Sequence, residues 1–311
     1  MSAIWAGFDV GTNSVKLLVG AVEGRAEAPR LEVLHHEVRV TRMGEGLNAS
    51  GVLSEAPMQR ALDAIDALAA VARQYAPRGM SALGMEAFRR AANSQAFARR
   101  IEERTGISLR VLEGEEEARL GREGVLLGFG EPLPEAVLVV DIGGGSTELA
   151  LTRPSWEVSV PRGAVTTSEA FLQSDPPMRD EMEQMRTALE EVFRDAWAGC
   201  PAASTAPTVV AVGGTITTYA AIAMQLAAFD ATRVHRARLT ASEIRAMTDR
   251  LAALPLSSRR DVVGLDPGRA PYIVGGGALL EAVLRSVGAH DVRVSVANLL
   301  HAHVVHEALR C

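Results

Sequence analysis

The 311-residue chain is predicted to be an α/β protein built from two related halves. The phrase GFDVGTNSVKLLVG at 7–20 recurs as VVDIGGGSTELALT at 139–152, so that Asp9 falls on Asp141, 132 residues later. In each half, three strand-like runs precede alternating helical and strand patterns, which favours mixed sheets flanked by helices. The stretch GFGEPLPE at 128–135, rich in Gly, Pro and acidic residues, marks a boundary between domains at 1–131 and 132–311. A cleft between the halves is the expected ligand site.

The elements follow from apolar periodicity and from the turn residues that interrupt it. Strands are expected in the first half at 3–9, 14–22, 31–40, 80–84 and 107–112, with helices at 54–76, at 95–105 and from the acidic segment EGEEEARLG. A loop carrying Arg89 and Arg90 should follow the strand at 80–84. The second half should have strands at 136–141, 147–152, 156–160, 208–212 and 291–296, and helices near 165–173, 178–198, 214–228, 240–253, 277–288 and 298–309.

Composition excludes several classes of protein. The net charge of −6 and pI of about 5.7 argue against a broad nucleic-acid-binding surface. Two cysteines, Cys200 and Cys311, give no disulfide framework and favour a reducing cytoplasm. The sequence has neither a signal-peptide pattern nor an apolar run long enough to span a membrane. Lys16 is the only lysine among 32 basic residues, which fits either a bias in genome composition or the use of Arg for phosphate contacts.

Each copy of the repeated phrase is predicted to be a phosphate-binding hairpin. An apolar strand, an Asp, a small-residue turn and a second strand would bring backbone N–H groups close to an anion. The phosphate ligands expected from the two turns are Gly11, Thr12, Asn13 and Ser14, and Gly143, Gly144, Gly145, Ser146 and Thr147. Asp9, Asp141 and Glu148 are the candidate ligands for Mg²⁺. The alternative for each hairpin by itself is an ordinary turn.

A third anion candidate is the strand-turn-helix segment with Gly213, Gly214 and Thr215, because a helix that starts after two glycines presents free N–H groups. The segment IVGGGALLEAVL at 273–284 is either a fourth such site or a tightly packed helix.

A general base is best sought in the acidic cluster Glu113, Glu115, Glu116 and Glu117. Most of this cluster should be a solvated helix start, and one member directed into a partly dry cleft could activate water. His301, His303 and His306 suggest a metal site only weakly, since their spacing does not put all three on one helix face.

These motifs resemble the exopolyphosphatase and guanosine pentaphosphate phosphohydrolase family, within the superfamily of actin, sugar kinases, acetate kinase and heat-shock chaperones. DIGGGSTEL is the most specific match, and DVGTNSVKLLV, TRMGEGL, EGEEEARLG, PRGAV and AVGGT match in order and spacing. The resemblance implies duplicated ribonuclease H-like (actin-like ATPase) domains and a short, two-domain type. It further implies that the terminal helix 298–310 returns to the first domain.

The resemblance also implies residue roles. Glu117 would be the catalytic base and Arg89 a phosphate ligand, with Asp141 and Glu148 at Mg²⁺ and the terminal phosphate. Mn²⁺ and K⁺ are further candidate ions, and a homodimer is left open. The sequence departs from the family at Met85-Glu86, where a Thr-Ser pair is usual, at Thr166, and at Asn298–His301.

Three functions are consistent with these features. The first is hydrolysis of the terminal phosphate of inorganic polyphosphate or of the 5′-γ-phosphate of guanosine pentaphosphate. The second is an ATP-dependent small-molecule kinase of the same superfamily, and the third is a catalytically weak regulator that binds polyphosphate or nucleotide.

Overall fold

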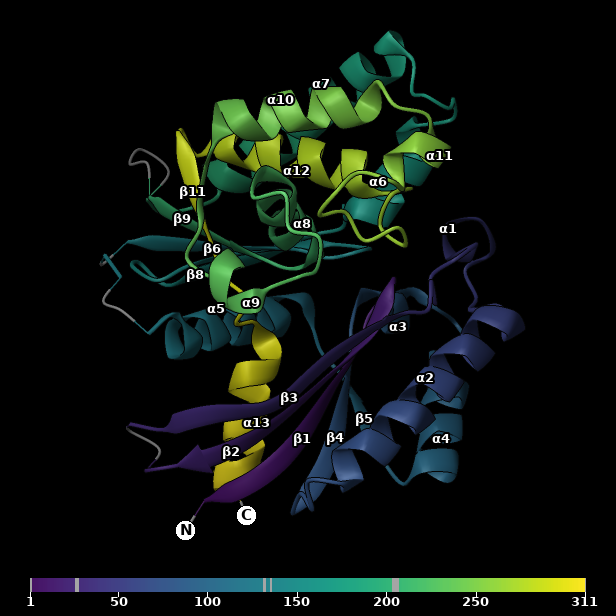
Figure 1. Ribbon diagram of the computed structural model, residues 1–311, viewed down its shortest axis with the longest axis vertical. Helices are drawn as coiled ribbons and strands as arrows, with labels where there is room; N and C mark the ends of the chain where they lie inside the picture. Colours follow the sequence, from purple (N-terminus) through teal and green to yellow (C-terminus); the bar gives the residue numbers. More distant parts are fainter. Residues whose placement is uncertain (1, 26–27, 131–132, 135, 203–206, 311) are drawn as a thin grey trace. The chain divides into compact units, whose positions relative to one another are not determined.

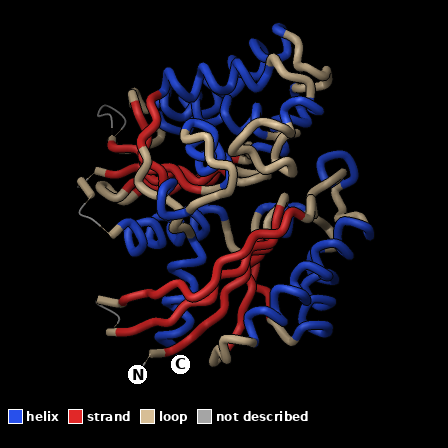
Figure 2. The backbone as a smooth tube through the Cα atoms, viewed as in Figure 1, coloured by secondary structure: helices blue, strands red, loops and turns tan. Residues whose placement is uncertain are grey.

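The structure is a computed structural model that describes residues 2–25, 28–130, 133–134, 136–202 and 207–310. Its contacts divide the chain into two compact units, one of residues 1–128 and 297–311 and the other of residues 129–296. Each unit is a mixed sheet with helices, which confirms the predicted fold class (Figures 1 and 2). Among the described residues, no helix has the length and apolar character needed to cross a bilayer.

The sheet of the first unit has the strand order β3-β2-β1-β4-β5. Its strands are β1 (Ala3–Val10), β2 (Ser14–Glu23), β3 (Arg30–Val40), β4 (Gly79–Gly84) and β5 (Ser108–Val111). The first three form an antiparallel meander, and β4 and β5 add in parallel on the other side of β1. β1 therefore occupies the centre of the sheet, and its carboxyl end carries Asp9 into the first turn.

Alternating side chains give this sheet two apolar faces. Phe8 and Leu17 pack with α2 (Glu55–Arg73) and α4 (Ser94–Thr105), whereas Trp5 and Leu18 pack with α13 (Leu299–Arg310). Figure 1 shows α2 and α4 on one side of the sheet and α13 on the other. The remaining helices of this unit are α1 (Leu47–Ser50), α3 (Glu86–Arg90) and α5 (Gly114–Phe129). The last helix of the chain is thus part of the layer that buries its first strands.

Histidine 303 joins α13 to the sheet. It is 4% exposed, and its Nε2 lies 2.8 Å from the Ser81 hydroxyl on β4. Burial, together with the charge of Arg110, lowers the pKa of His303 from 6.5 to about 4. The folded protein therefore keeps this imidazole neutral over a range in which the unfolded chain is protonated.

We expect this difference to make stability depend on pH. Above pH 6.5 the contribution of His303 is fully present, and it is lost as the pH falls from 6.5 to about 4 because only the unfolded state takes up the proton. In chemical denaturation, the free energy of unfolding of the wild type should fall between pH 7 and pH 4.5 by about 2–3 kcal/mol more than that of His303→Gln. The exposed His290→Gln serves as control. Equal losses in all three proteins would contradict the prediction.

The sheet of the second unit has the order β10-β11-β9-β6-β7-β8. Its strands are β6 (Val137–Ile142), β7 (Thr147–Leu151), β8 (Trp156–Val160), β9 (Thr208–Val212), β10 (Arg238–Thr240) and β11 (Asp291–Val294). β6, β7 and β8 repeat the antiparallel meander of the first unit, and β9 lies parallel to β6 as β4 lies parallel to β1. The short strand β10 was not predicted, and β11 ends at Val294 rather than at residue 296.

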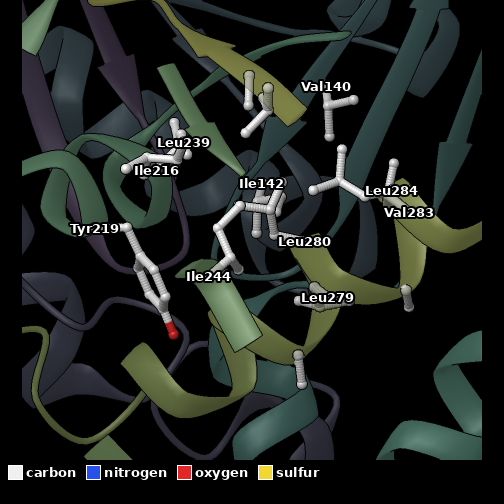
Figure 3. Close-up of a cluster of buried hydrophobic side chains, with 14 of the residues drawn as sticks. Val140, Ile142, Ile216, Tyr219, Leu239, Ile244, Leu279, Leu280, Val283 and Leu284 are labelled. Atoms are coloured by element: carbon white, nitrogen blue, oxygen red, sulfur yellow. The ribbon is translucent and has the colours of Figure 1, made fainter. Parts of the chain in front are cut away.

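Seven helices are described in the second unit: α6 (Ala164–Phe171), α7 (Arg179–Ala198), α8 (Gly214–Ala223), α9 (Ala231–Val234), α10 (Ala241–Ala252), α11 (Leu256–Arg259) and α12 (Ile273–Ser286). α12 is their centre and contacts α6, α7, α8 and α10. Figure 3 shows Leu279, Leu280 and Val283 of α12 in one core with Ile142 and Tyr219. α8 ends at Ala223, five residues before the predicted end at 228.

The glycines at 275–277 lie inside α12 and are buried in close contact with neighbouring residues, which confirms the tight-packing alternative for this segment. A Cβ added to Gly277 would lie 1.8 Å from the Tyr219 hydroxyl oxygen, which is bonded to Thr248 at 2.9 Å. We expect Gly277→Ala to destabilise the protein by about 1–3 kcal/mol in thermal or chemical denaturation. Gly121→Ala is the matched control, because its Cβ meets nothing within 4 Å. A Gly277→Ala variant with the stability of the wild type would contradict this packing.

Candidate active site

The two repeated hairpins close with the same backbone geometry. The Gly11 amide donates to the Ser14 carbonyl at 3.0 Å, and the Gly143 amide donates to the Ser146 carbonyl at 3.0 Å. In both copies the Asp at the strand end pairs across the ladder with a charged residue: Asp9 with Lys16, and Asp141 with Glu148 in the second hairpin. The duplication read from the sequence is therefore a duplication of local structure.

A segment after the third strand of each meander holds its turn. In the first unit the amides of Thr41 and Arg42 each donate to the Asn13 carbonyl at 2.9 Å, and the Gly44 amide donates to the Thr12 carbonyl at 2.8 Å. The TRMGEGL motif therefore fixes the backbone of the first turn.

The second turn is held in the equivalent way. The Ala164 amide donates to the Gly143 carbonyl and the Val165 amide to the Gly144 carbonyl, each at 2.9 Å. The PRGAV motif thus has the same structural role as TRMGEGL. The Thr166 hydroxyl adds a bond to the Gly145 carbonyl at 3.2 Å, so the residue that departs from the family pattern still supports this turn.

The side chains of the first hairpin form a compact polar cluster. Asp9 is 2% exposed, and its Oδ2 accepts from the Lys16 ammonium at 2.6 Å. The other oxygen of Asp9, Oδ1, and the side-chain oxygen of Asn13 are buried and lack a hydrogen-bond partner within the described residues. Buried acceptors without a donor are costly, so these two oxygens are suited to a bound cation or a ligand donor.

Arginine 89 and Glu117, the proposed catalytic pair, are in direct contact. The Arg89 Nη1 donates to Glu117 Oε2 at 2.8 Å and to the Leu112 carbonyl at 2.7 Å. Their side chains are 17% and 9% exposed, so the pair is largely shielded from water. Arg89 lies on α3, which corrects the prediction of a loop at this position. Glu86, the first residue of the same helix, contacts Thr12, so α3 links this pair to the first hairpin.

Within the acidic cluster, the structure separates Glu117 from its neighbours. Glu117 is 7% exposed, whereas Glu113 and Glu115 are exposed and Glu116 is bonded to Arg110 at 2.6 Å. The cluster begins α5, as predicted from its charge. Only the packing of α5 identifies the member that is turned inward.

In the second hairpin the two candidate metal ligands are cross-strand neighbours. Asp141 on β6 pairs with Glu148 on β7, and Glu148 is 3% exposed with Oε1 accepting from the Ser159 hydroxyl at 2.8 Å. Thr147 is fully buried, and its hydroxyl donates to the Arg162 carbonyl at 2.6 Å. The Thr147 hydroxyl therefore stabilises the turn, and its proton is not directed to an anion. Ser146 is also buried, at 3% exposure.

The third candidate segment lies beside the second hairpin. β9 runs parallel to β6 and ends at Val212, opposite Asp141. Gly213 follows with a φ of +95°, and a Cβ at this position would be 2.7 Å from Asp141 Oδ1. Glycine is therefore required here by both conformation and space. Gly214 and Thr215 then open α8, whose first turn presents amides as predicted.

Two basic residues that were not predicted as site residues contact predicted ones in the structure. Arg269 lies so close to Gly214 that a Cβ there would be 2.0 Å from its Nη1, and burial lowers the pKa of this guanidinium below its ordinary value. Lys16 contacts Asp9, and the same 132-residue offset that aligns the two aspartates aligns Lys16 with Glu148. That offset could have identified Lys16, whereas Arg269 stands in no recurring motif.

The predicted residues fall into two sets, one in each unit. The first hairpin, Arg89 and Glu117 belong to the first unit, and the second hairpin with Gly213–Thr215 belongs to the second. Among the described residues there is no group of three or more His, Cys, Asp or Glu that could hold a metal ion by itself. The C-terminal histidines do not form one: His303 contacts Ser81, and His306 contacts Glu123 at 3.2 Å.

The chain is similar to known phosphatases over most of its length. Residues 21–310 match the model of the Ppx/GppA phosphatase family. Exopolyphosphatase 2 of Mycobacterium tuberculosis is 30% identical over 311 residues, covering 95% of both chains. A bifunctional 3-dehydroquinate synthase/phosphatase of Fusobacterium nucleatum is 26% identical over 93% of this chain and 44% of that protein.

Solved structures agree with this similarity. A crystal structure of an exopolyphosphatase-like protein matches with a TM-score of 0.90 at 29% identity, covering 99% of this chain and 98% of the other. The Ppx/GppA family member of Aquifex aeolicus matches with a TM-score of 0.80 at 26% identity, covering 100% of this chain and 99% of that one. Both similarities extend over both units.

Proposed function

Because the chain belongs to the Ppx/GppA phosphatase family, we propose that it is a phosphoanhydride hydrolase that releases the terminal phosphate of inorganic polyphosphate. The observation that carries the proposal is the pair of hairpins whose turns close with the same backbone hydrogen bond. Each hairpin has a buried or half-buried Asp near the end of its first strand. Both turns are held by a second segment, so their amides are fixed before substrate binds. Fixed donors stabilise a phosphoryl group without further reorganisation.

The residues present fit Mg²⁺. This ion is commonly bound through one or two carboxylates, with water and substrate phosphates as the other ligands. Asp141 and Glu148 supply two carboxylates from facing positions of one ladder. In the first unit, Asp9 Oδ1 is a separate buried acceptor that could also contact a cation. The lack of a three-residue metal group among the described residues agrees with an ion that needs phosphate oxygens to complete its shell. When bound, Mg²⁺ would neutralise charge on the transferred phosphoryl group.

The proposed chemistry on the protein side centres on Glu117. Its carboxylate would orient and deprotonate the attacking water, and Arg89 would hold that carboxylate in place and offer its other N–H groups to the terminal phosphate. A guanidinium has five donors, so bonds to Glu117 and to the Leu112 carbonyl leave donors for a phosphate. Shielding of the pair from water strengthens both interactions.

Guanosine pentaphosphate has the same kind of terminal anhydride, and the hairpin geometry does not distinguish it from polyphosphate. A phosphate-release assay on long polyphosphate, tripolyphosphate, guanosine pentaphosphate and ATP, with Mg²⁺, with Mn²⁺ and with a chelator, tests the proposal. Release from polyphosphate that requires the divalent ion and no acceptor supports it. ATP consumption only with an added metabolite would replace it by the kinase, and binding without release under every condition would replace it by the regulator.

A further inference from the structure

Glutamate 86 is a buried carboxylate beside the first hairpin that the proposed chemistry does not use. It is the first residue of α3 and is 5% exposed. Burying a carboxylate is unfavourable unless partners compensate for the lost hydration. Its two carboxylate oxygens contact different partners, one of them Arg90 and the other Thr12.

One oxygen is well bonded and the other is not. Oε1 accepts from the Arg90 Nη1 at 2.8 Å, whereas Oε2 is 3.4 Å from the Thr12 hydroxyl oxygen, a long contact. The Arg90 side chain is 40% exposed and that of Glu86 is 6% exposed. Solvent therefore screens the cation more than the anion, and the pair leaves a partly uncompensated negative charge at Thr12.

The contact also affects the donor that Thr12 could offer. A hydroxyl has one proton, and the Thr12 proton is directed to Glu86 in this arrangement. The Asp9 Oδ1 and Asn13 Oδ1 atoms are further buried acceptors of the same short segment. The side chains at and beside the first turn thus include several oxygen acceptors, whereas a phosphate needs donors.

We propose that Glu86 is a binding-site residue that weakens the affinity of the first hairpin for phosphate groups. Its carboxylate competes with phosphate oxygens for the Thr12 proton and repels them. The inference rests on the proposed function, since it assigns Glu86 a role at the same phosphate site. It makes the affinity for a phosphate chain, rather than the rate of the chemical step, the property that Glu86 sets.

Glu86→Gln tests this, because glutamine keeps the size and a hydrogen-bonding oxygen while removing the charge. We expect the KM for polyphosphate to fall about three- to tenfold, as one partly screened charge at close range predicts, with kcat within about twofold. The difference from wild type should shrink as salt is raised. Glu45→Gln is the matched control, because Glu45 lies in the segment beside the same turn but is 57% exposed and paired with Arg60.

Direct binding separates this inference from the proposed function. Binding of Mg²⁺ with tripolyphosphate is measured by calorimetry in the Glu117→Gln background, with and without Glu86→Gln. Tighter binding in the double variant, with no change on adding Glu45→Gln, supports the inference. Equal or weaker binding by a double variant with a wild-type melting curve overturns it, and Glu86→Ser repeats the comparison if the Gln variant does not fold. Failure of the wild type to release phosphate would count against the proposed function alone.

Discussion

The Glu117→Gln variant is expected to bind polyphosphate about as tightly as wild type and to release phosphate about 10²–10⁴-fold more slowly, the usual value of a general base. Glutamine keeps the shape of the side chain and an oxygen for the Arg89 bond of 2.8 Å, but it cannot take a proton from water. The loss should appear in kcat rather than in KM, because the base acts on the reacting water and not on the bound chain.

The measurement is steady-state phosphate release together with calorimetric binding of the chain. Glu116→Gln is the matched control, since Glu116 is adjacent on α5, is bonded to Arg110 at the surface and should retain full activity. Wild-type turnover by Glu117→Gln would remove this residue from the mechanism. Loss of binding in parallel with loss of turnover would instead assign it to holding Arg89.

Asp141→Asn is expected to reduce phosphate release by roughly 10²–10³-fold. This loss corresponds to the several kcal/mol by which a bound metal stabilises the charge of the transition state. Asparagine preserves the size of the side chain while it removes the charge and replaces one acceptor oxygen with an NH2 donor. The half-saturating Mg²⁺ concentration should rise, because one of two facing carboxylates is lost. Activity measured across a Mg²⁺ titration gives both quantities.

Glu157→Gln, on β8 of the same sheet, is the control for removing a negative charge from this unit. An Asp141→Asn variant with unchanged activity and unchanged Mg²⁺ dependence would refute a metal role for the second hairpin. Asp9→Asn should also reduce turnover if the first hairpin binds the substrate, although the bond of Asp9 to Lys16 gives this residue a part in folding as well. A stability measurement on this variant separates the two effects.

The sequence predicted the strands around the hairpins well because two constraints coincide there. The strands alternate or run apolar, and the Asp and the small turn residues fix their ends, so the predicted strands at 3–9 and 136–141 lie within one residue of β1 and β6 at each end. The conformation of such a hairpin is set by residues close together in the sequence, and the duplicated phrase gave the same evidence at two places in the chain.

The prediction failed where structure is short or is set by distant contacts. α3 has five residues, too few for helical periodicity to be recognised, so its arginines were placed in a loop. β10 has three residues and exists because it pairs with β11, some fifty positions later in the chain. Charge and periodicity could not select the buried member among Glu113, Glu115, Glu116 and Glu117, because that depends on how α5 packs, whereas the motif resemblance pointed to Glu117.

The position of α13 also has a consequence for how the protein is made. The hydrophobic surface that β1 and β2 turn toward α13 is synthesised well before α13, because the whole second unit lies between them in the sequence. Domains commonly fold in order of synthesis. Here the second unit, residues 129–296, can finish folding before the first, in which Trp5 and Leu18 stay uncovered until α13 has been made. Truncation of the chain before α13 would therefore destabilise the first unit, although the missing residues follow the second unit in the sequence.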